Sequence, residues 1–166
     1  KPVAGDLRLL MTYMGDEPVA VLYRPVAPDA PRSDAWKAVS PVWEVSFDQV
    51  KRLDGVRMAR AETANGYTFE AAIPLKAIGL VPKPPTRLKL DWGVLATDPD
   101  GTQVLHRSYW SNKATSILSD APTEAALHPA LWGTLRILGR GGTSADNPLL
   151  RDDKDIDDIE LELEGN

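Results

Sequence analysis

The stretch 87–110, RLKLDWGVLATDPDGTQVLHRSYW, decides the fold that the sequence predicts. Polar and apolar residues alternate through 87–98 and again through 102–110, which is the two-residue period of a half-buried β-strand. The proline, aspartate and glycine between these segments favour a tight turn. The stretch therefore predicts two antiparallel strands, and we expect Trp92 in the first of them to be a core residue.

Strand patterns of the same kind recur along most of the chain. Asn65-Gly66 is the clearest turn, because an Asn-Gly pair between two β-type runs is a strong hairpin signal. Gly15-Asp16 separates two further runs, and Gly79 is expected to close a single helical turn. The expected strands are 6–13, 18–25, 41–48, 55–63, 67–74, 87–98, 102–110 and 131–138. About eight strands without a sustained helical period indicate an all-β protein, specifically an antiparallel β-sandwich.

Length and composition fit one domain followed by a tail. The chain has 166 residues, of which 43% are hydrophobic, close to the average for globular proteins. We place the β-sandwich domain at 1–138, and a glycine-rich connector with an acidic C-terminal tail at 139–166. Apolar residues alternate with glutamate over 159–164, so the tail is expected either to add an edge strand or to remain solvated. We favour a tail docked on a neighbouring surface over a second domain.

Charge and cysteine content exclude several classes of protein. Residues 146–166 carry nine acidic and two basic side chains, a net charge of −7, which leaves +2 for the rest of a chain whose total is −5. Residues 1–145 are therefore nearly neutral, and they lack the clustered positive charge of a nucleic-acid-binding protein. No apolar run approaches the ~20 residues that span a bilayer. The absence of cysteine excludes disulfides, thiolate metal sites and a cysteine nucleophile.

Motifs of known catalytic sites are missing from the sequence. The two histidines, His106 and His128, do not form a zinc motif. Neither a Gly-x-Ser-x-Gly elbow nor a phosphate-binding loop occurs. Paired carboxylates could still meet in space, as in glycosidases, but we expect a protein that is not an enzyme. Because the chain begins at Lys1 without a methionine, we also expect a piece of a longer polypeptide.

Asp98 and Asp100 bracket the turn between the expected strands 87–98 and 102–110. Two carboxylates at positions i and i+2 can bind a hard cation such as calcium through their oxygens. Alternatively, aspartate side chains in such a turn hydrogen-bond to their own backbone. We favour the turn, and keep Asp98 and Asp100 as candidate metal ligands.

Four of the five tryptophans separate into two groups. Trp92 and Trp132 lie within apolar strands, so we expect both in the core. Trp36 and Trp110 are flanked by polar residues. Sugar rings stack their C–H faces on aromatic rings, while their hydroxyl groups bind polar side chains. Trp110 is therefore either a platform for a sugar or a lid that closes the end of the sandwich over its core. The polar candidates for binding sugar hydroxyl groups are Asn112, Arg107 and Asp98.

Ordered motifs in the second half of the chain resemble carbohydrate-binding module family 9. GYTFEAAIPLKAIGL (66–80) is similar to that family's strand-and-turn segment. RLKLDWGVLATDPDG (87–101) resembles its strand with an aspartate-rich turn, and HPALWGTLRIL (128–138) resembles its closing strand. VWEVSFDQV (42–50) looks like a degenerate form of a further strand. The resemblance covers roughly 40–138; the start of the chain fits poorly, so we expect the domain to be truncated or divergent there.

The resemblance implies a DOMON-like β-sandwich of jelly-roll or immunoglobulin-like arrangement, without catalytic activity. It implies that a polysaccharide or oligosaccharide binds between two tryptophans, with Trp110 and Trp36 in those positions, and that calcium serves as a structural ion. It also implies an exported, multidomain bacterial protein that is secreted, periplasmic or on the cell surface. Neighbouring domains of the parent polypeptide are the other expected partners.

Two other functions stay open. The acidic, alternating tail favours a structural or interaction module that has kept the sandwich and lost the sugar site. Some DOMON-like relatives bind haem, although methionine is more often core filler than a ligand. The candidate axial ligands for haem are Met11, Met14, Met58 and His106.

Overall fold

The structure is a computed structural model, and it describes residues 1–41, 43–64, 66–81, 83, 86–113, 117–118, 121–122, 127–137 and 161–164. Within these residues the protein is all-β, and its helical segments are short 3-10 turns. The seven strand pairings with a defined register are antiparallel. The expected all-β antiparallel class is confirmed, while the sandwich arrangement stays a prediction. No helix in the described part is long and apolar enough to cross a membrane.

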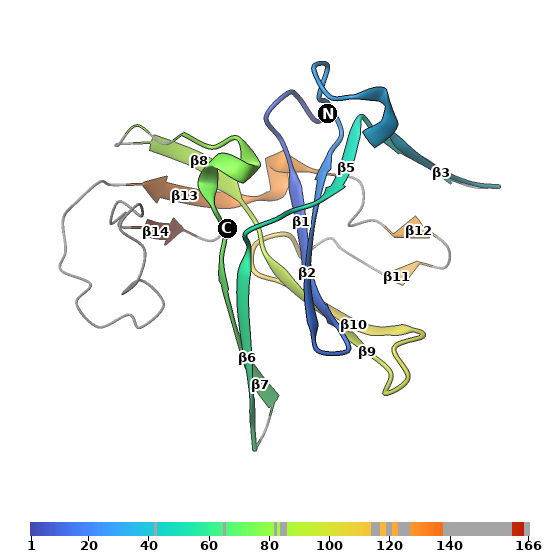
Figure 1. The fold of residues 1–166 in the computed structure, drawn as a ribbon, viewed down its shortest axis with the longest axis vertical. Helices are drawn as coiled ribbons and strands as arrows, with labels where there is room; N and C mark the ends of the chain where they lie inside the picture. The colour runs from blue at the N-terminus through green and yellow to red at the C-terminus, as the bar shows by residue number, and fades with distance from the viewer. Residues whose placement is uncertain are drawn as a thin grey trace. The chain divides into compact units, whose positions relative to one another are not determined.

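The elements follow one another as short strands joined by turns (Figure 1). In chain order they are β1 (Arg8–Met14), β2 (Glu17–Arg24), η1 (Arg32–Asp34), β3 (Trp36–Ser40), β4 (Trp43–Phe47), β5 (Gln49–Arg52), β6 (Arg57–Thr63), β7 (Gly66–Ala72), η2 (Leu75–Ile78), β8 (Thr86–Leu90), β9 (Gly93–Thr97), β10 (Val104–Tyr109), β11 (Ile117–Leu118), β12 (Ala121–Pro122), η4 (Pro129–Leu131), β13 (Gly133–Ile137) and β14 (Leu161–Glu164). Sheets β1-β2-β5 and β14-β13-β8 have three strands, and the remaining strands pair as β3-β4, β6-β7, β9-β10 and β11-β12.

The chain divides into two compact units. The N-terminal unit comprises Val3–Lys37 and Ser46–Val81, and the C-terminal unit comprises Lys1–Pro2, Ala38–Val45 and Pro82–Asn166. The first contains sheet β1-β2-β5 and hairpin β6-β7, whereas the second contains sheet β14-β13-β8 and hairpin β9-β10. The domain limits expected from the sequence, 1–138 and 139–166, stay a prediction.

Turn residues fix the hairpins of the N-terminal unit. Met14 pairs with Glu17, so Gly15 and Asp16 form the expected two-residue turn, and Gly15 adopts the left-handed conformation that such a turn needs. Thr63 similarly pairs with Gly66 between β6 and β7, although Asn65 of the expected turn lies outside the described residues. Each hairpin thus forms where the sequence places its turn.

The core of the N-terminal unit forms under β2. Leu22 is fully buried there, together with Ala20 and Leu53. Partly buried apolar residues surround this cluster; they are Leu7, Leu9, Met11, Val56, Met58, Ala77 and Ile78. Ala77 and Ile78 come from η2, which ends at Gly79 in a left-handed cap, so the expected helical turn is confirmed.

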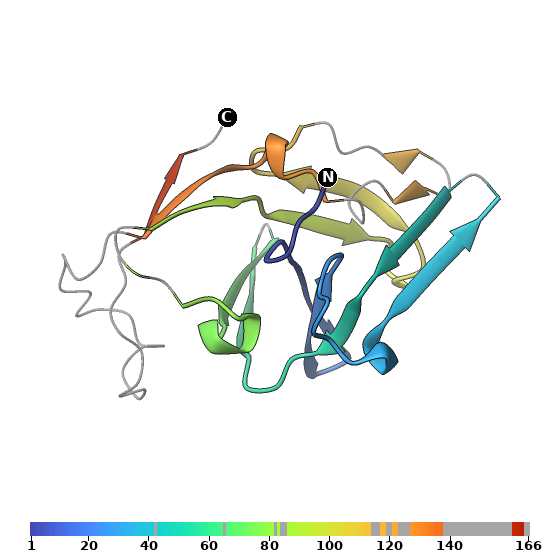
Figure 2. The ribbon, with the colours of Figure 1, turned by 90° about the horizontal axis from the view of Figure 1, so that it is seen from above.

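A break divides the long strand that the sequence predicts over 87–98. β8 pairs with β13 and β9 pairs with β10, and Asp91 and Trp92 lie between β8 and β9 in the chain. Figure 2 shows β8 and β9 as two successive strands. Leu88 and Leu90 are half-buried before the break, but after it Trp92 is exposed while Gly93 is half-buried. The side chains therefore change faces at Asp91, because a shift of one residue exchanges the two sides of a strand. The expected core position of Trp92 is wrong for this reason, and its exposed fraction is 55%.

The acidic tail contributes a strand to the C-terminal unit. β14 pairs antiparallel with β13, with Leu161 opposite Ile137 and Glu164 opposite Thr134. Because β13 pairs with β8 on its other side, β14 forms the edge of a three-stranded sheet. The tail therefore adds an edge strand, which is one of the two outcomes that its alternation left open.

Candidate functional site

The pairing of β9 with β10 defines an exposed face in the C-terminal unit. Val94 pairs with Ser108 and Ala96 with His106, and all four residues are exposed. The ladder continues where the backbone N–H of Trp110 donates to the carbonyl oxygen of Trp92 over 2.9 Å. Paired residues point to the same side of a sheet, and alternate residues along a strand share that side. We call this surface the outer face; its residues are Trp92, Val94, Ala96, His106, Ser108 and Trp110.

Close packing within the hairpin occupies its opposite side, which we call the inner side. Tyr109 pairs with Gly93, and a Cβ atom on Gly93 would lie only 2.7 Å from Cδ1 of the Tyr109 ring. Glycine is therefore required at position 93, because the ring occupies the space of a side chain. Arg107 pairs with Leu95 on this inner side, where both are half-buried.

The two tryptophans lie at one end of the outer face. Trp92 exposes more than half of its surface, and Trp110 is half-buried. Single exposed apolar residues are common on proteins, but exposed apolar surface that gathers in one place marks binding sites. Val94, on the same face, is also exposed. Both roles expected for Trp110, a platform for a sugar and a lid over the core, stay predictions.

Asp91 holds the two segments that carry these tryptophans. Its Oδ1 accepts hydrogen bonds from the backbone N–H of Trp92 at 3.0 Å and of Ser111 at 2.8 Å. Its Oδ2 accepts one from the backbone N–H of Asn112 at 3.0 Å. A single carboxylate thus fixes both the break between β8 and β9 and the chain that follows Trp110.

The segment after Trp110 turns inward rather than outward. Ser111 and Asn112 are 5% and 8% exposed, and Oγ of Ser111 donates to the carbonyl oxygen of Leu131 at 3.1 Å. Nζ of Lys113 donates to the carbonyl oxygens of Tyr109 and Trp110. These contacts anchor the end of β10, and they keep Asn112, a predicted sugar ligand, away from the outer face.

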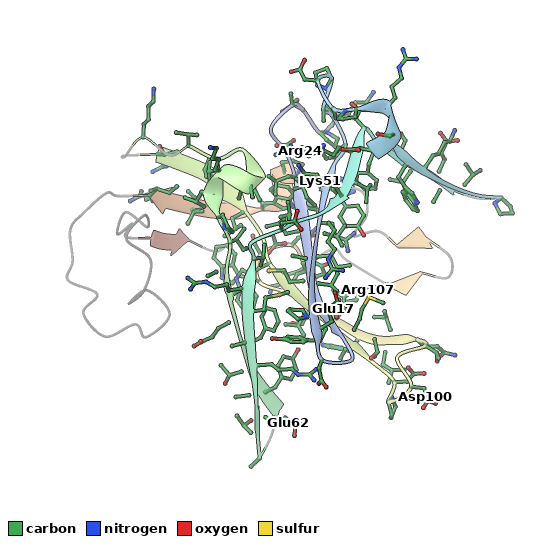
Figure 3. All side chains as sticks on the ribbon, in the orientation of Figure 1. Glu17, Arg24, Lys51, Glu62, Asp100 and Arg107 are labelled. Carbon is green, nitrogen blue, oxygen red and sulfur yellow. The ribbon has the colours of Figure 1, made fainter. Side chains whose placement is uncertain are left out.

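Asp98 lies at the other end of the hairpin, in the turn that Figure 3 shows at Asp100. Its carboxylate accepts hydrogen bonds from the hydroxyl of Thr102, from the backbone N–H of Thr102 at 2.6 Å and from that of Gln103 at 3.1 Å. These bonds, the Thr102 hydroxyl first among them, hold the pKa of Asp98 below its ordinary value of 3.8. Gly101 completes the turn by donating its N–H to the Asp98 carbonyl at 3.0 Å. This is the hydrogen-bonded turn that the sequence favoured.

Calcium binding by Asp98 and Asp100 stays a prediction. Both oxygens of the Asp98 carboxylate accept hydrogen bonds inside the turn. Among the described residues, no group of three or more histidine, aspartate or glutamate side chains is placed to hold a metal ion. The structure therefore supplies a role for Asp98 that does not involve a cation.

Trp36 and Arg107 are the remaining predicted site residues. Trp36 is 47% exposed, as expected, but it belongs to the N-terminal unit, where its ring lies 6.2 Å from that of Phe47. Arg107 is on the inner side of the hairpin, opposite Leu95, and Figure 3 shows it away from the turn that contains Asp100. Arg107 is therefore not part of the outer face, and Trp36 belongs to the other unit.

The candidate haem ligands have other surroundings. Met11 and Met58 pack against the core of the N-terminal unit, as methionine commonly does. Met14 is exposed beside the β1-β2 turn, and His106 lies on the outer face of the C-terminal unit. Packing accounts for Met11 and Met58 without a haem.

Comparison with known proteins finds no family model, curated protein or solved structure that matches the chain. The resemblance to carbohydrate-binding module family 9 therefore stays a prediction, and the site rests on the geometry of the outer face. Sequence reasoning missed Trp92, His106 and Ser108 as members of that face. The signal that could have found them is the alternation of β10, which places residues 106, 108 and 110 on one side.

Proposed function

We propose that the chain is a non-catalytic carbohydrate-binding module that binds sugar on the outer face. The observation that carries this proposal is the exposure of Trp92, a large aromatic side chain placed across the ladder from Trp110. An aromatic ring in that position offers its apolar surface to the C–H face of a sugar ring. Polysaccharide or oligosaccharide is therefore the ligand.

The composition of the outer face fits sugar binding better than sugar cleavage. His106 and Ser108 provide polar groups for hydroxyls beside the two tryptophans. The face carries no carboxylate, whereas glycoside hydrolysis commonly uses a pair of them. Because the surface is one side of a two-stranded ribbon, it suits an extended, unbranched chain laid along the hairpin. The module is proposed to act in an exported multidomain protein, where binding holds the neighbouring domains at a polysaccharide.

The test is affinity electrophoresis of the full chain in gels that contain soluble glucans, xylans or mannans, followed by calorimetry with the matching oligosaccharide. Trp92→Ala is expected to weaken binding by about tenfold or more, as for a central aromatic contact at an interface. Its melting temperature is expected to change little, because Trp92 is exposed.

The matched control is Tyr67→Ala. Tyr67 is another exposed aromatic residue, 59% exposed, and it belongs to the N-terminal unit. This variant is expected to bind sugar as strongly as the unmodified chain. Equal binding by Trp92→Ala and the unmodified chain, or no retention on any polysaccharide, would contradict the proposal.

A structural or interaction module is the second candidate function. The observation in its favour is that β14 is the edge strand of sheet β14-β13-β8, because the backbone of an edge strand can accept a strand from another molecule. The absence of sugar retention, together with self-association of the chain, would favour this candidate over the first.

A further inference from the structure

The exposed side of β8 leads along the chain into the outer face. Arg87 and Lys89 are exposed on one side of β8, and after the break at Asp91 the exposed residues are Trp92 and Val94. Unbroken alternation from Arg87 and Lys89 would have placed Trp92 on the buried side. The shift at Asp91 therefore brings two cations and then the tryptophan to the exposed surface in succession. We call Arg87 and Lys89 the basic extension of the outer face.

Hydrogen bonds join the tryptophan end of the outer face to the ladder of β8 and β13. Oγ of Ser111 donates to the carbonyl oxygen of Leu131 at 3.1 Å, and Nζ of Lys89 donates to that of Trp132, also at 3.1 Å. These two acceptors directly precede β13, which pairs with β8. Lys89 also lies within about 11 Å of Trp92 along the backbone, because each of three residues spans at most about 3.6 Å. The basic extension is therefore close to the tryptophans.

The basic extension has no carboxylate opposite it on β13. Lys89 pairs with Thr134, and Arg87 pairs with Arg136. Like charges that stand directly opposite one another destabilise a ladder, and an anion bound between them would relieve this repulsion. Arg136 stands opposite Glu162 of β14 in the register of its other side, so we assign only Arg87 and Lys89 to the extension.

The carboxylate nearest in sequence to the extension is that of Asp91. Its two oxygens accept hydrogen bonds from three backbone N–H groups, which compensate its negative charge. Asp91 is also half-buried. It therefore adds little repulsion toward an anion that approaches Lys89 and Trp92.

We propose that the basic extension makes the outer face a site for an anionic polysaccharide, one whose sugar rings carry carboxylate or sulfate groups. One ring stacks on Trp92, and the anionic groups of the following rings reach Lys89 and then Arg87 as the chain runs along β9 and β8. A guanidinium group donates two parallel hydrogen bonds to such an anion, while an ammonium group acts as a point charge. This inference rests on the proposed function, because it names the class of ligand for the same surface.

The experiment is calorimetric titration of the full chain with matched pairs of soluble polymers. Polygalacturonate is compared with its methyl-esterified form, and dextran sulfate with dextran, so that the members of each pair share a backbone and differ in charge. At least one charged polymer is expected to bind about tenfold or more tightly than its neutral partner, and the pair that shows the difference distinguishes carboxylate from sulfate. Added salt should reduce this difference, because it screens charges at the surface.

Two single variants locate the charge that the polymer meets. Arg87→Gln and Lys89→Gln are each expected to weaken binding of the charged polymer by about fivefold, which is the upper range for an exposed ion pair. Binding of the neutral partner should not change. The matched control is Lys51→Gln, which removes an exposed cation of the N-terminal unit and should leave both affinities unchanged. Circular dichroism checks that each variant is folded.

Equal binding of the charged and neutral members of both pairs overturns the proposal. So does a loss in Lys51→Gln as large as that in Arg87→Gln, because the attraction would then not be specific to the basic extension. Trp92→Ala separates this failure from failure of the proposed function. If Trp92→Ala weakens binding while Arg87→Gln and Lys89→Gln do not, the ligand class is wrong and the sugar site stands. If no polymer of either kind binds, both are wrong.

Discussion

Asp91 supports the outer face without belonging to it. Its carboxylate accepts hydrogen bonds from the backbone N–H groups of Trp92, Ser111 and Asn112. Two of these donors belong to buried residues, where water cannot replace a lost acceptor. The carboxylate therefore determines where the chain bends before Trp92 and where it turns inward after Trp110.

We predict that Asp91→Ala destabilises the protein by about 2–6 kcal/mol, because each of the two buried donors left without an acceptor costs about 1–3 kcal/mol. Urea unfolding followed by circular dichroism measures the change. Asp54→Ala is the control, since Asp54 is an exposed carboxylate, and substitutions of that kind usually stay within about 0.5 kcal/mol. Equal stability of the two variants would show that the Asp91 carboxylate does not hold the segments around Trp92 and Trp110 in place.

At the scale of elements, the turn between β9 and β10 responds to acid through Asp98. Its pKa is held below 3.8 in the folded protein, so the folded state favours the charged carboxylate. The stabilisation is therefore complete above the ordinary pKa and is lost as the pH falls through the lower, folded value. Protonation weakens the hydrogen bonds that Asp98 accepts from Thr102 and Gln103.

The lowered pKa of Asp98 gives a prediction for the amide resonances of Thr102 and Gln103. Both should shift as the pH is lowered, with a midpoint below 3.8. In Asp98→Asn the acid-dependent shift should vanish, because the amide does not titrate. A midpoint at or above 3.8 would show that the turn does not favour the charged form.

Turns were predictable from the sequence because their residue types act locally. Gly15-Asp16 and Gly79 formed the turn and the cap that were expected. The break at Asp91 was not predictable from alternation, because polar and apolar residues continue to alternate through Asp91 and Trp92 while the buried side changes. What fixes the break is the contact of Asp91 with Ser111, far along the chain.

Two of the predicted polar partners of Trp110 lie away from the outer face, for two physical reasons. Arg107 precedes Trp110 by an odd number of strand positions, so the two residues point to opposite sides of the hairpin. That much could have been read from the sequence. Asn112 follows the strand and is drawn inward by its backbone hydrogen bond to Asp91, a long-range contact that no local pattern reveals.

At the scale of the whole molecule, each compact unit is made of segments that are separated in the sequence. The C-terminal unit combines Ala38–Val45 with Pro82–Asn166, and the N-terminal unit is likewise made of separate segments. A sugar site made of Trp36 and Trp110 would draw on both units, whereas the outer face lies within the C-terminal unit alone. The proposed site at Trp92 and Trp110 therefore consists of residues of the C-terminal unit, to which Trp36 does not belong.

The most direct test of sugar binding on the outer face is an NMR titration of the full chain that follows the indole N–H resonances of its tryptophans. The titrant is the oligosaccharide of the polysaccharide that retains the chain best, with cellohexaose and xylohexaose as the first choices. The signals of Trp92 and Trp110 are expected to shift together and to saturate, while those of Trp36 and Trp132 stay in place. Saturable shifts at Trp36 without shifts at Trp92, or no shift at Trp92 with any oligosaccharide, would contradict the assignment of the outer face as the binding site.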